Sequence, residues 1–157
     1  MIRSARVVIA STRAARGVYT DQCGPIIVDW LAHRGFDVTT DVVADGPAVG
    51  DAMRAALAQH VDVLITSGGT GISPTDSTPQ ATLELLDYQI PGLADAIRRS
   101  GLPKVPTSVL SRGVCGVAGR TLVVNLPGSS GGVRDGLGVL AEVLDHALDQ
   151  LAGGDHG

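Results

Sequence analysis

Short apolar runs alternate along this chain with segments of helical periodicity, and that alternation restricts the fold more than any other feature. Val7–Ala10 and Val61–Thr66 are dominated by apolar, β-branched residues, which is typical of strands covered on both faces. Between these runs, residues 22–34 and 46–60 repeat apolar side chains every three or four positions, as helices do. Strands that alternate with helices predict a parallel sheet with helices packed on it.

The remaining elements complete one domain. Residues 36–43 predict a strand near an edge of the sheet, and Thr78 as N-cap followed by Pro79 predicts a helix at 79–88. Further predicted elements are a helix at 91–100, a hairpin of residues 109–117 and 120–126, a helix at 133–151 and a frayed tail at 153–157. We expect one three-layer α/β/α domain over residues 1–157, with its core at about 6–151, a mostly parallel sheet and one antiparallel strand.

The charge and hydropathy of the chain argue against two classes of partner. Its 157 residues include 12 Lys and Arg against 16 Asp and Glu, a net charge of −4, without a basic run that suits nucleic acid. No stretch of about 18 apolar residues could cross a membrane, and the first residues lack the apolar segment of a signal peptide. We expect a cytoplasmic protein that binds neither nucleic acid nor membrane.

Cysteine and histidine give no sign of a metal centre. Cys23 and Cys115 lack the spacing of metal ligands, so we expect two buried free thiols. The histidines at positions 33, 60, 146 and 156 are also scattered without ligand spacing. Metal binding by histidine is therefore not expected.

Polar residues and glycines follow the predicted parallel strands at their carboxyl ends. They are Ser11–Thr12, Asp45, Gly68–Gly71 with Asp76, and Asn125–Ser129. Loops and helix N-termini converge beyond these ends of a parallel sheet, so the four segments should share one edge. Arg13, Arg16 and Arg112 are possible cations nearby. Glycine amides, hydroxyls and carboxylates together suit phosphate and Mg²⁺.

The loop Gly68–Gly71 has two interpretations. Its glycines can adopt positive φ and bring the backbone close to an anion, which favours a nucleotide or phosphate site, or they can form a tight structural turn. It is not a Walker A loop, because the only lysine, Lys104, lies far from any glycine-rich turn between strand and helix. A G-x-G-x-x-G fingerprint is absent as well.

Other residues at this edge also have a structural alternative. Asp76 could hold a cation beside the glycines or form an Asx-turn, and Asp45 could cap the helix that follows it. Ser129 or Ser130 could cap the last helix, whose N-terminus could also receive an anion. Arg112 could reach a phosphate or lie solvated on a strand.

Several motifs, in the order in which they occur, resemble the molybdopterin adenylyltransferases of molybdenum cofactor synthesis, the MogA/MoaB family. The N-terminal domain of gephyrin is similar to this family. The motifs are Asp21–Pro25, Thr66–Gly71, Asp76–Thr82, Leu110–Arg112, Val114–Gly116 and Thr121–Ser129. The similarity covers about residues 6–151, and several spaced motifs in the right order are more specific than any one of them.

The resemblance implies the family's fold, a homo-oligomer (a trimer, or a hexamer as a dimer of trimers) and a reaction. The reaction is Mg²⁺-dependent transfer of AMP from ATP to the terminal phosphate of molybdopterin. By position, Asp45 and Asp76 match the family's catalytic aspartates, and we assign Mg²⁺ binding to both. The residues expected to bind the substrates are Thr12, Ser67, Gly68, Gly69, Thr70, Gly71, Arg112, Pro127, Gly128, Ser129 and Ser130. A molybdenum-insertion protein is a possible further partner.

Three positions depart from the family pattern. Thr75 stands where a basic residue often precedes the aspartate, Gly46 where an acid often follows Asp45, and Gly113 where proline is frequent. These departures bear on rate and substrate affinity more than on the reaction class. Three alternatives stay open. The first is a non-catalytic molybdopterin-binding paralogue of the MoaB type, and the second is a nucleotide hydrolase of the competence-damage type, whose paired aspartates this loop lacks. The third is a structural protein that mainly builds an oligomer or scaffold.

Overall fold

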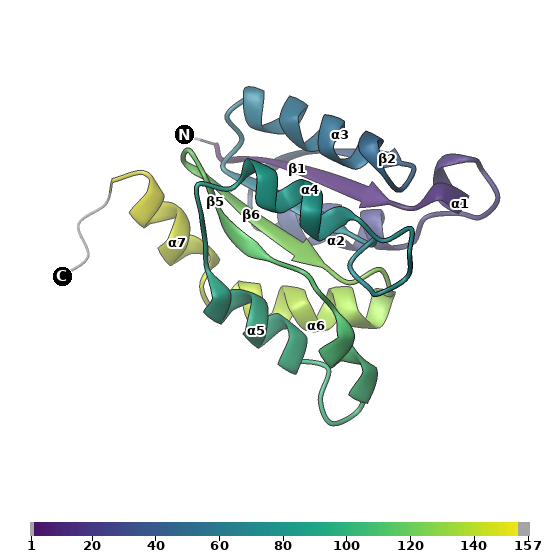
Figure 1. Cartoon of the computed structure of the whole chain (residues 1–157). Helices are drawn as coiled ribbons and strands as arrows, with labels where there is room; N and C mark the ends of the chain where they lie inside the picture. Colours follow the sequence, from purple (N-terminus) through teal and green to yellow (C-terminus); the bar gives the residue numbers. More distant parts are fainter. Residues whose placement is uncertain (1, 154–157) are drawn as a thin grey trace.

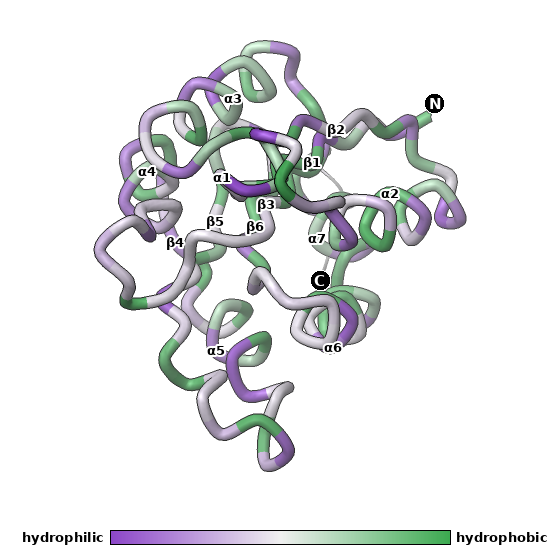
Figure 2. Tube along the Cα trace, turned by 90° about the vertical axis from the view of Figure 1, so that its right-hand side faces the viewer, coloured by the Kyte–Doolittle hydropathy of each residue, from purple (hydrophilic) through white to green (hydrophobic). Residues whose placement is uncertain are grey.

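Within residues 2–153, which the computed structural model describes, six strands form one sheet in the order β2-β1-β3-β6-β5-β4 (Figures 1 and 2). The strands are β1 (Ser4–Ala10), β2 (Asp37–Val43), β3 (Val63–Ser67), β4 (Tyr88–Gln89), β5 (Cys115–Ala118) and β6 (Thr121–Leu126). β1 pairs in parallel with β2 and β3, and β3 with β6, whereas β5 runs antiparallel to both β4 and β6. The predicted mostly parallel sheet with one antiparallel strand is confirmed.

Helices cover both faces of this sheet. Over the described residues they are α1 (Thr12–Ala15), α2 (Cys23–His33), α3 (Pro47–Ala58), α4 (Thr78–Leu85), α5 (Pro91–Arg99), α6 (Ser130–Ala141) and α7 (Leu144–Leu151), with the 3₁₀ helix η1 (Pro106–Leu110). Helices α3 and α4 lie on one face, and α2, α5, α6 and α7 lie on the other (Figure 2). The three-layer α/β/α architecture is confirmed.

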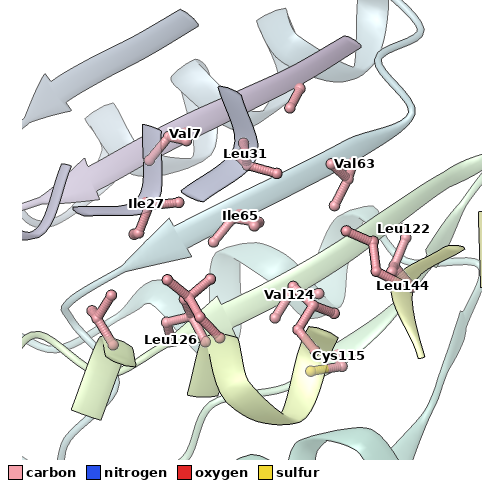
Figure 3. Packing of buried hydrophobic residues seen from close by; sticks show 14 of the residues in the cluster. Val7, Ile27, Leu31, Val63, Ile65, Cys115, Leu122, Val124, Leu126 and Leu144 are labelled. Atoms are coloured by element: carbon pink, nitrogen blue, oxygen red, sulfur yellow. The ribbon is translucent and has the colours of Figure 1, made fainter. Parts of the chain in front are cut away.

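The central strands are buried on both faces because successive side chains of a strand point to opposite sides of the sheet. In β1, Val7 packs with Ile27 and Leu31 of α2 (Figure 3), while Val8 packs with Met53 of α3. All five side chains are fully buried. Each contributes about 1.5–3 kcal/mol of hydrophobic stabilisation, so the strands form a firm base for the loops at their carboxyl ends.

The single helix predicted at 133–151 is two helices, α6 and α7. The chain bends at Glu142 and Val143, and α6 begins earlier than predicted. The predicted apolar stripe is nevertheless correct, since Leu137 of α6 and Leu144 and Leu148 of α7 are buried in the same cluster. The stripe continues across the bend, and for this reason the bend could not be read from periodicity.

The strand predicted at 109–117 begins only at Cys115. Pro106 opens the 3₁₀ helix, and the amide of Arg112 then donates to the carbonyl of Thr70 at 2.7 Å. The amide of Val114 donates to the side-chain oxygen of Asn125 at 3.1 Å. These residues tie a loop to the sheet instead of extending β5, so Arg112 does not lie on a strand.

The helix predicted at 79–88 starts and ends earlier. Ser77, not Thr78, is the N-cap residue of α4. The helix ends because the amide of Asp87 donates to the carbonyl of Val117 at 2.8 Å, which draws the following residues to the sheet edge as β4. The carboxylate of Asp87 also accepts from the amide of Gly119 at 2.7 Å, in the turn of the predicted β5–β6 hairpin.

The other predicted elements differ in smaller ways. The strand predicted at 36–43 is β2 and lies at a sheet edge, as expected, whereas α1 and β4 were not predicted. Cys23 and Cys115 are free and buried. Except for Gly153, the predicted tail lies outside the described residues. None of the helices in residues 2–153 has the length and apolar character that a membrane span requires.

Candidate functional site

Two clefts open at the carboxyl ends of the parallel strands and share a wall. The first, the acidic cleft, has a volume of about 690 Å³, and its charged lining residues are Arg13, Asp21, Asp45 and Asp76. The second, the basic cleft, has a volume of about 750 Å³, and its charged lining residues are Asp76, Arg98, Lys104, Arg134 and Asp135. Gly69, Asp76 and Gly128 line both clefts. The predicted edge of the sheet therefore holds two adjoining sites.

Asp45 is fixed by the segment that follows β1. Its Oδ2 accepts hydrogen bonds from the amide of Thr12 at 3.3 Å and from the Thr12 hydroxyl at 3.0 Å, and its own amide donates to that hydroxyl at 3.1 Å. The N-cap residue of α3 is Gly46, so the alternative interpretation of Asp45 as the cap of this helix is wrong. The carboxylate lines the acidic cleft, and its Oδ1 accepts no hydrogen bond from the described residues.

Asp76 lies in a tight turn that begins at Ser73. Its amide donates to the Ser73 carbonyl at 2.9 Å, and its Oδ2 accepts from the Ser73 amide at 3.3 Å. An Asx-turn would bond the amide two residues further on, so that alternative is wrong. Asp76 is the one predicted catalytic residue that lines both clefts, and within residues 2–153 its Oδ1 accepts no hydrogen bond.

The loop Gly68–Gly71 forms the wall between the clefts. Gly68 has a φ of 93° and Gly69 a φ of 67°, backbone conformations that other residues rarely adopt. A Cβ on Gly69 would also collide with the hydroxyl of Thr78. The amides of the loop's last three residues donate to no acceptor in the described part of the chain. The loop is thus a tight turn whose free amides suit an anion.

The loop after β6 is bonded to the end of β3 and contains the predicted cap of α6. Ser67 donates its hydroxyl to the carbonyl of Pro127 at 2.7 Å, which joins the ends of β3 and β6. Ser129 is the N-cap of α6 and accepts from the amide of Gly132 at 3.1 Å, so the predicted cap is confirmed. Ser129 also lines the basic cleft, whereas Ser130 lines neither cleft.

Arg112 supports the glycine loop and lines neither cleft. Its Nε donates to the carbonyl of Gly71 and its Nη2 to the carbonyl of Asp76, both at 2.8 Å. Since these bonds engage two of the three guanidinium nitrogens, the structure gives Arg112 the role of holding the loop that carries Asp76. The other substrate-binding residues predicted from sequence each line at least one cleft, apart from Ser130.

Two residues at the start of α2 line the acidic cleft but were not predicted as site residues. The carboxylate of Asp21 accepts from the amides of Cys23 at 3.1 Å and Gly24 at 3.0 Å. The Cys23 thiol donates to the carbonyl of Gly128 at 3.4 Å, and burial raises its pKa. The motif Asp21–Pro25 was the available signal, but from sequence it indicated only a helix start.

The cations of the basic cleft were also not predicted. Arg98 donates to the carbonyls of Ser111 at 3.2 Å and Gly113 at 2.8 Å, so it holds the loop before β5. Lys104 and Arg134 are exposed, and their side chains form no hydrogen bond or ion pair with the described residues. Neither belongs to a motif, and only the fold brings them to one cleft.

Asp45 and Asp76 are the residues that could hold a metal ion. No group of three or more His, Cys, Asp or Glu side chains suits a metal within residues 2–153. Mg²⁺ is usually held by one or two carboxylates, with water and substrate phosphate completing its shell. The two carboxylates line one cleft beside free amides, so the donor set fits a cation that is shared with a phosphate-bearing ligand.

Comparison with known proteins identifies the family. The model of a family described as "Probable molybdopterin binding domain" matches residues 6–146. The chain belongs to this family. A solved structure of the molybdopterin biosynthesis Mog protein from Mycobacterium ulcerans is 71% identical to this chain, with a TM-score of 0.93 over 95% of this chain and 99% of that chain.

Curated relatives agree with this assignment. The molybdenum cofactor biosynthesis bifunctional protein of Synechococcus elongatus is 37% identical over 155 residues, which are 98% of this chain and 49% of that protein. The chain thus spans about half the length of that relative. The molybdopterin adenylyltransferase of Escherichia coli is 33% identical over 136 residues, which are 83% of this chain and 70% of that protein. The resemblance that the motifs indicate is confirmed.

Proposed function

We propose that this protein binds molybdopterin, transfers AMP from ATP to its terminal phosphate and releases pyrophosphate. The observation that carries the proposal is the wall shared by two clefts of opposite charge, where Gly69 and Asp76 face both. Two phosphate-bearing substrates bound on either side of this wall would meet at Asp76. Membership of the family and similarity to a protein named molybdopterin adenylyltransferase support the same reaction.

The residues of the acidic cleft have distinct roles in this proposal. Asp45 and Asp76 would hold Mg²⁺, which supplies positive charge beside the phosphates when it is bound. Thr12 keeps the carboxylate of Asp45 in place through two hydrogen bonds. The free amides of the glycine loop would donate to phosphate oxygens.

The transfer needs no protein nucleophile. An oxygen of the molybdopterin phosphate forms a bond to the α-phosphorus of ATP, and the bond from that phosphorus to the α,β-bridging oxygen breaks. Pyrophosphate leaves with the electron pair of the broken bond. The attacking phosphate is already ionised at neutral pH, so no side chain has to remove a proton. The contribution of the protein is positioning and charge neutralisation.

Adenylylation with purified molybdopterin, ATP and Mg²⁺ tests the proposal. We expect pyrophosphate and adenylylated molybdopterin to form only when all three are present. Binding of molybdopterin without pyrophosphate release would contradict the proposal and indicate a non-catalytic paralogue of the MoaB type. Hydrolysis of an ADP-ribose-like compound without the pterin would indicate the hydrolase alternative.

We also propose a homo-oligomer, a trimer or a hexamer. Around the 3₁₀ helix, Val105, Val109 and Leu110 are 46%, 54% and 50% exposed, and gathered apolar side chains are typical of contact surfaces. Light scattering on the purified chain should give three or six times the monomer mass. A monomer at micromolar concentration would contradict this part of the proposal.

A further inference from the structure

Three arginines lie near the carboxyl ends of the strands, and the structure separates their roles. Arg112 is engaged with two carbonyl groups of the loop that carries Asp76. Arg16 is exposed and lines neither cleft. Arg13 lines the acidic cleft, and its guanidinium forms no hydrogen bond or ion pair with the described residues. Arg13 is therefore the arginine that is free to contact a ligand.

The negative charge of the acidic cleft makes Arg13 important for binding an anionic ligand there. Among the described residues it is the single cation in a lining that also contains Asp21, Asp45 and Asp76. A triphosphate chain carries more negative charge than one divalent cation neutralises. Without Arg13, the charged side chains described in this lining would all be carboxylates, and their repulsion of the excess negative charge would oppose binding.

The backbone of Arg13 is fixed relative to the proposed metal site. Arg13 directly follows Thr12, whose amide and hydroxyl bind the carboxylate of Asp45. The carbonyl of Arg13 accepts from the amide of Val18 at 2.8 Å, which closes the turn after α1. The guanidinium thus extends from a backbone that is tied to one of the two carboxylates proposed to hold Mg²⁺.

We propose that Arg13 binds the phosphate chain of ATP in the acidic cleft, an inference that rests on the proposed AMP transfer. A guanidinium can donate two parallel hydrogen bonds to phosphate oxygens. When the bond between the α-phosphorus and the bridging oxygen breaks, negative charge increases on the departing pyrophosphate. A cation beside that group stabilises it, so Arg13 contributes to nucleotide affinity and to the departure of pyrophosphate.

Arg16 offers a matched control, because it carries the same charge on the same exposed turn but lines neither cleft. The experiment compares wild type with Arg13→Gln, Arg13→Lys and Arg16→Gln. Calorimetry measures the binding of Mg–ATP and of Mg–pyrophosphate without molybdopterin, and the pyrophosphate assay gives kcat and the KM for ATP. Thermal unfolding confirms that each variant is folded.

We expect Arg13→Gln to weaken the binding of both ligands about 10- to 100-fold, the effect of losing a charged hydrogen bond. Arg13→Lys should recover part of the affinity because it keeps the charge but loses the paired donors. Arg16→Gln should stay within about 2-fold of wild type. Unchanged affinity in Arg13→Gln overturns the inference, and so does an equal loss in Arg16→Gln, which would indicate only long-range charge.

The two proposals can fail separately. If wild type binds Mg–ATP in an Arg13-dependent way but releases no pyrophosphate with molybdopterin, AMP transfer is wrong and the role of Arg13 in binding stands. If wild type releases pyrophosphate and Arg13→Gln has the same KM for ATP and the same kcat, the role of Arg13 is wrong and AMP transfer stands. A wild type that binds no nucleotide overturns both.

Discussion

The acidic and basic clefts differ in how their charged groups are held. In the acidic cleft, hydrogen bonds fix two carboxylates: Asp45 accepts from Thr12, and Asp21 accepts from two amides at the start of α2. In the basic cleft, Lys104 and Arg134 are exposed, and their side chains form no hydrogen bond or ion pair within residues 2–153. The acidic cleft thus has carboxylates that are fixed by hydrogen bonds, whereas two of the three cations of the basic cleft are unrestrained; the third, Arg98, is held by the loop before β5.

This difference indicates two kinds of ligand. Mg²⁺ demands near-ideal geometry, so a carboxylate that would hold it benefits from being fixed in advance. An ammonium or guanidinium on a long side chain can instead follow an anion of variable position. The comparison suggests that a metal-bound nucleotide belongs in the acidic cleft and a second anionic substrate in the basic cleft.

The largest effect should come from the residue that both clefts share. Asp76→Asn keeps the shape of the side chain but removes the charge proposed to hold Mg²⁺, so we expect kcat to fall about 100- to 1000-fold. Molybdopterin binding should be largely retained, which fluorescence titration can measure. Asp135→Asn is the control, because it removes the same charge from the basic cleft alone. Equal turnover in Asp76→Asn and wild type would contradict the assignment of Mg²⁺ binding to Asp76.

Gly69→Ala should disturb both clefts at once. Alanine at a φ of 67° costs about 1–2 kcal/mol, and the added Cβ would also meet the hydroxyl of Thr78. Gly119→Ala is the control, since Gly119 has a φ of 59° but no atom within 4 Å of the added Cβ. We expect a larger fall in Tm for Gly69→Ala and weaker binding of both substrates. Equal Tm values and unchanged binding would contradict the account of this wall.

A smaller effect should test which of the two substrates binds in each cleft. Lys104→Gln removes an exposed cation of the basic cleft, so we expect the KM for molybdopterin to rise about 3- to 10-fold. The KM for ATP should not change, because Lys104 does not line the acidic cleft. Steady-state kinetics with each substrate varied in turn measures both values. A rise confined to the KM for ATP would reverse the assignment.

The smallest effect concerns the two thiols. Burial raises the pKa of both, that of Cys115 to about 12, so each is mostly protonated at pH 8 and should react slowly with a thiol reagent. Reaction should accelerate as pH rises, and Cys23, which lines the acidic cleft, should react before Cys115. Mg–ATP should slow the reaction of Cys23 alone. Mass spectrometry after timed labelling distinguishes the sites, and equal protection of both would contradict a nucleotide in that cleft.

The sequence allowed correct predictions where the fold requires a regular pattern of burial or a particular backbone conformation. The central strands β1, β3 and β6 could be predicted because they are mostly buried, and the shared edge followed from where they end. Asp45 and Asp76 were placed in one cleft for this reason, although 31 positions separate them. The glycine loop was recognisable because positive φ and close approach to Thr78 require glycine there.

The features that were missed depend on tertiary contacts. Arg112 acts on carbonyls of a loop 36 to 41 positions away, which no local pattern reveals. Lys104 and Arg134 come from different elements and meet only at the basic cleft. The bend at Val143 was hidden because the apolar stripe continues on both sides of it.

A crystal structure with Mg²⁺ and a non-hydrolysable ATP analogue tests the central claim most directly. We predict the phosphate chain in the acidic cleft, with the metal bound by Asp45 and Asp76 and the loop amides directed at phosphate oxygens. A triphosphate in the basic cleft, or a metal held away from both aspartates, would contradict the account.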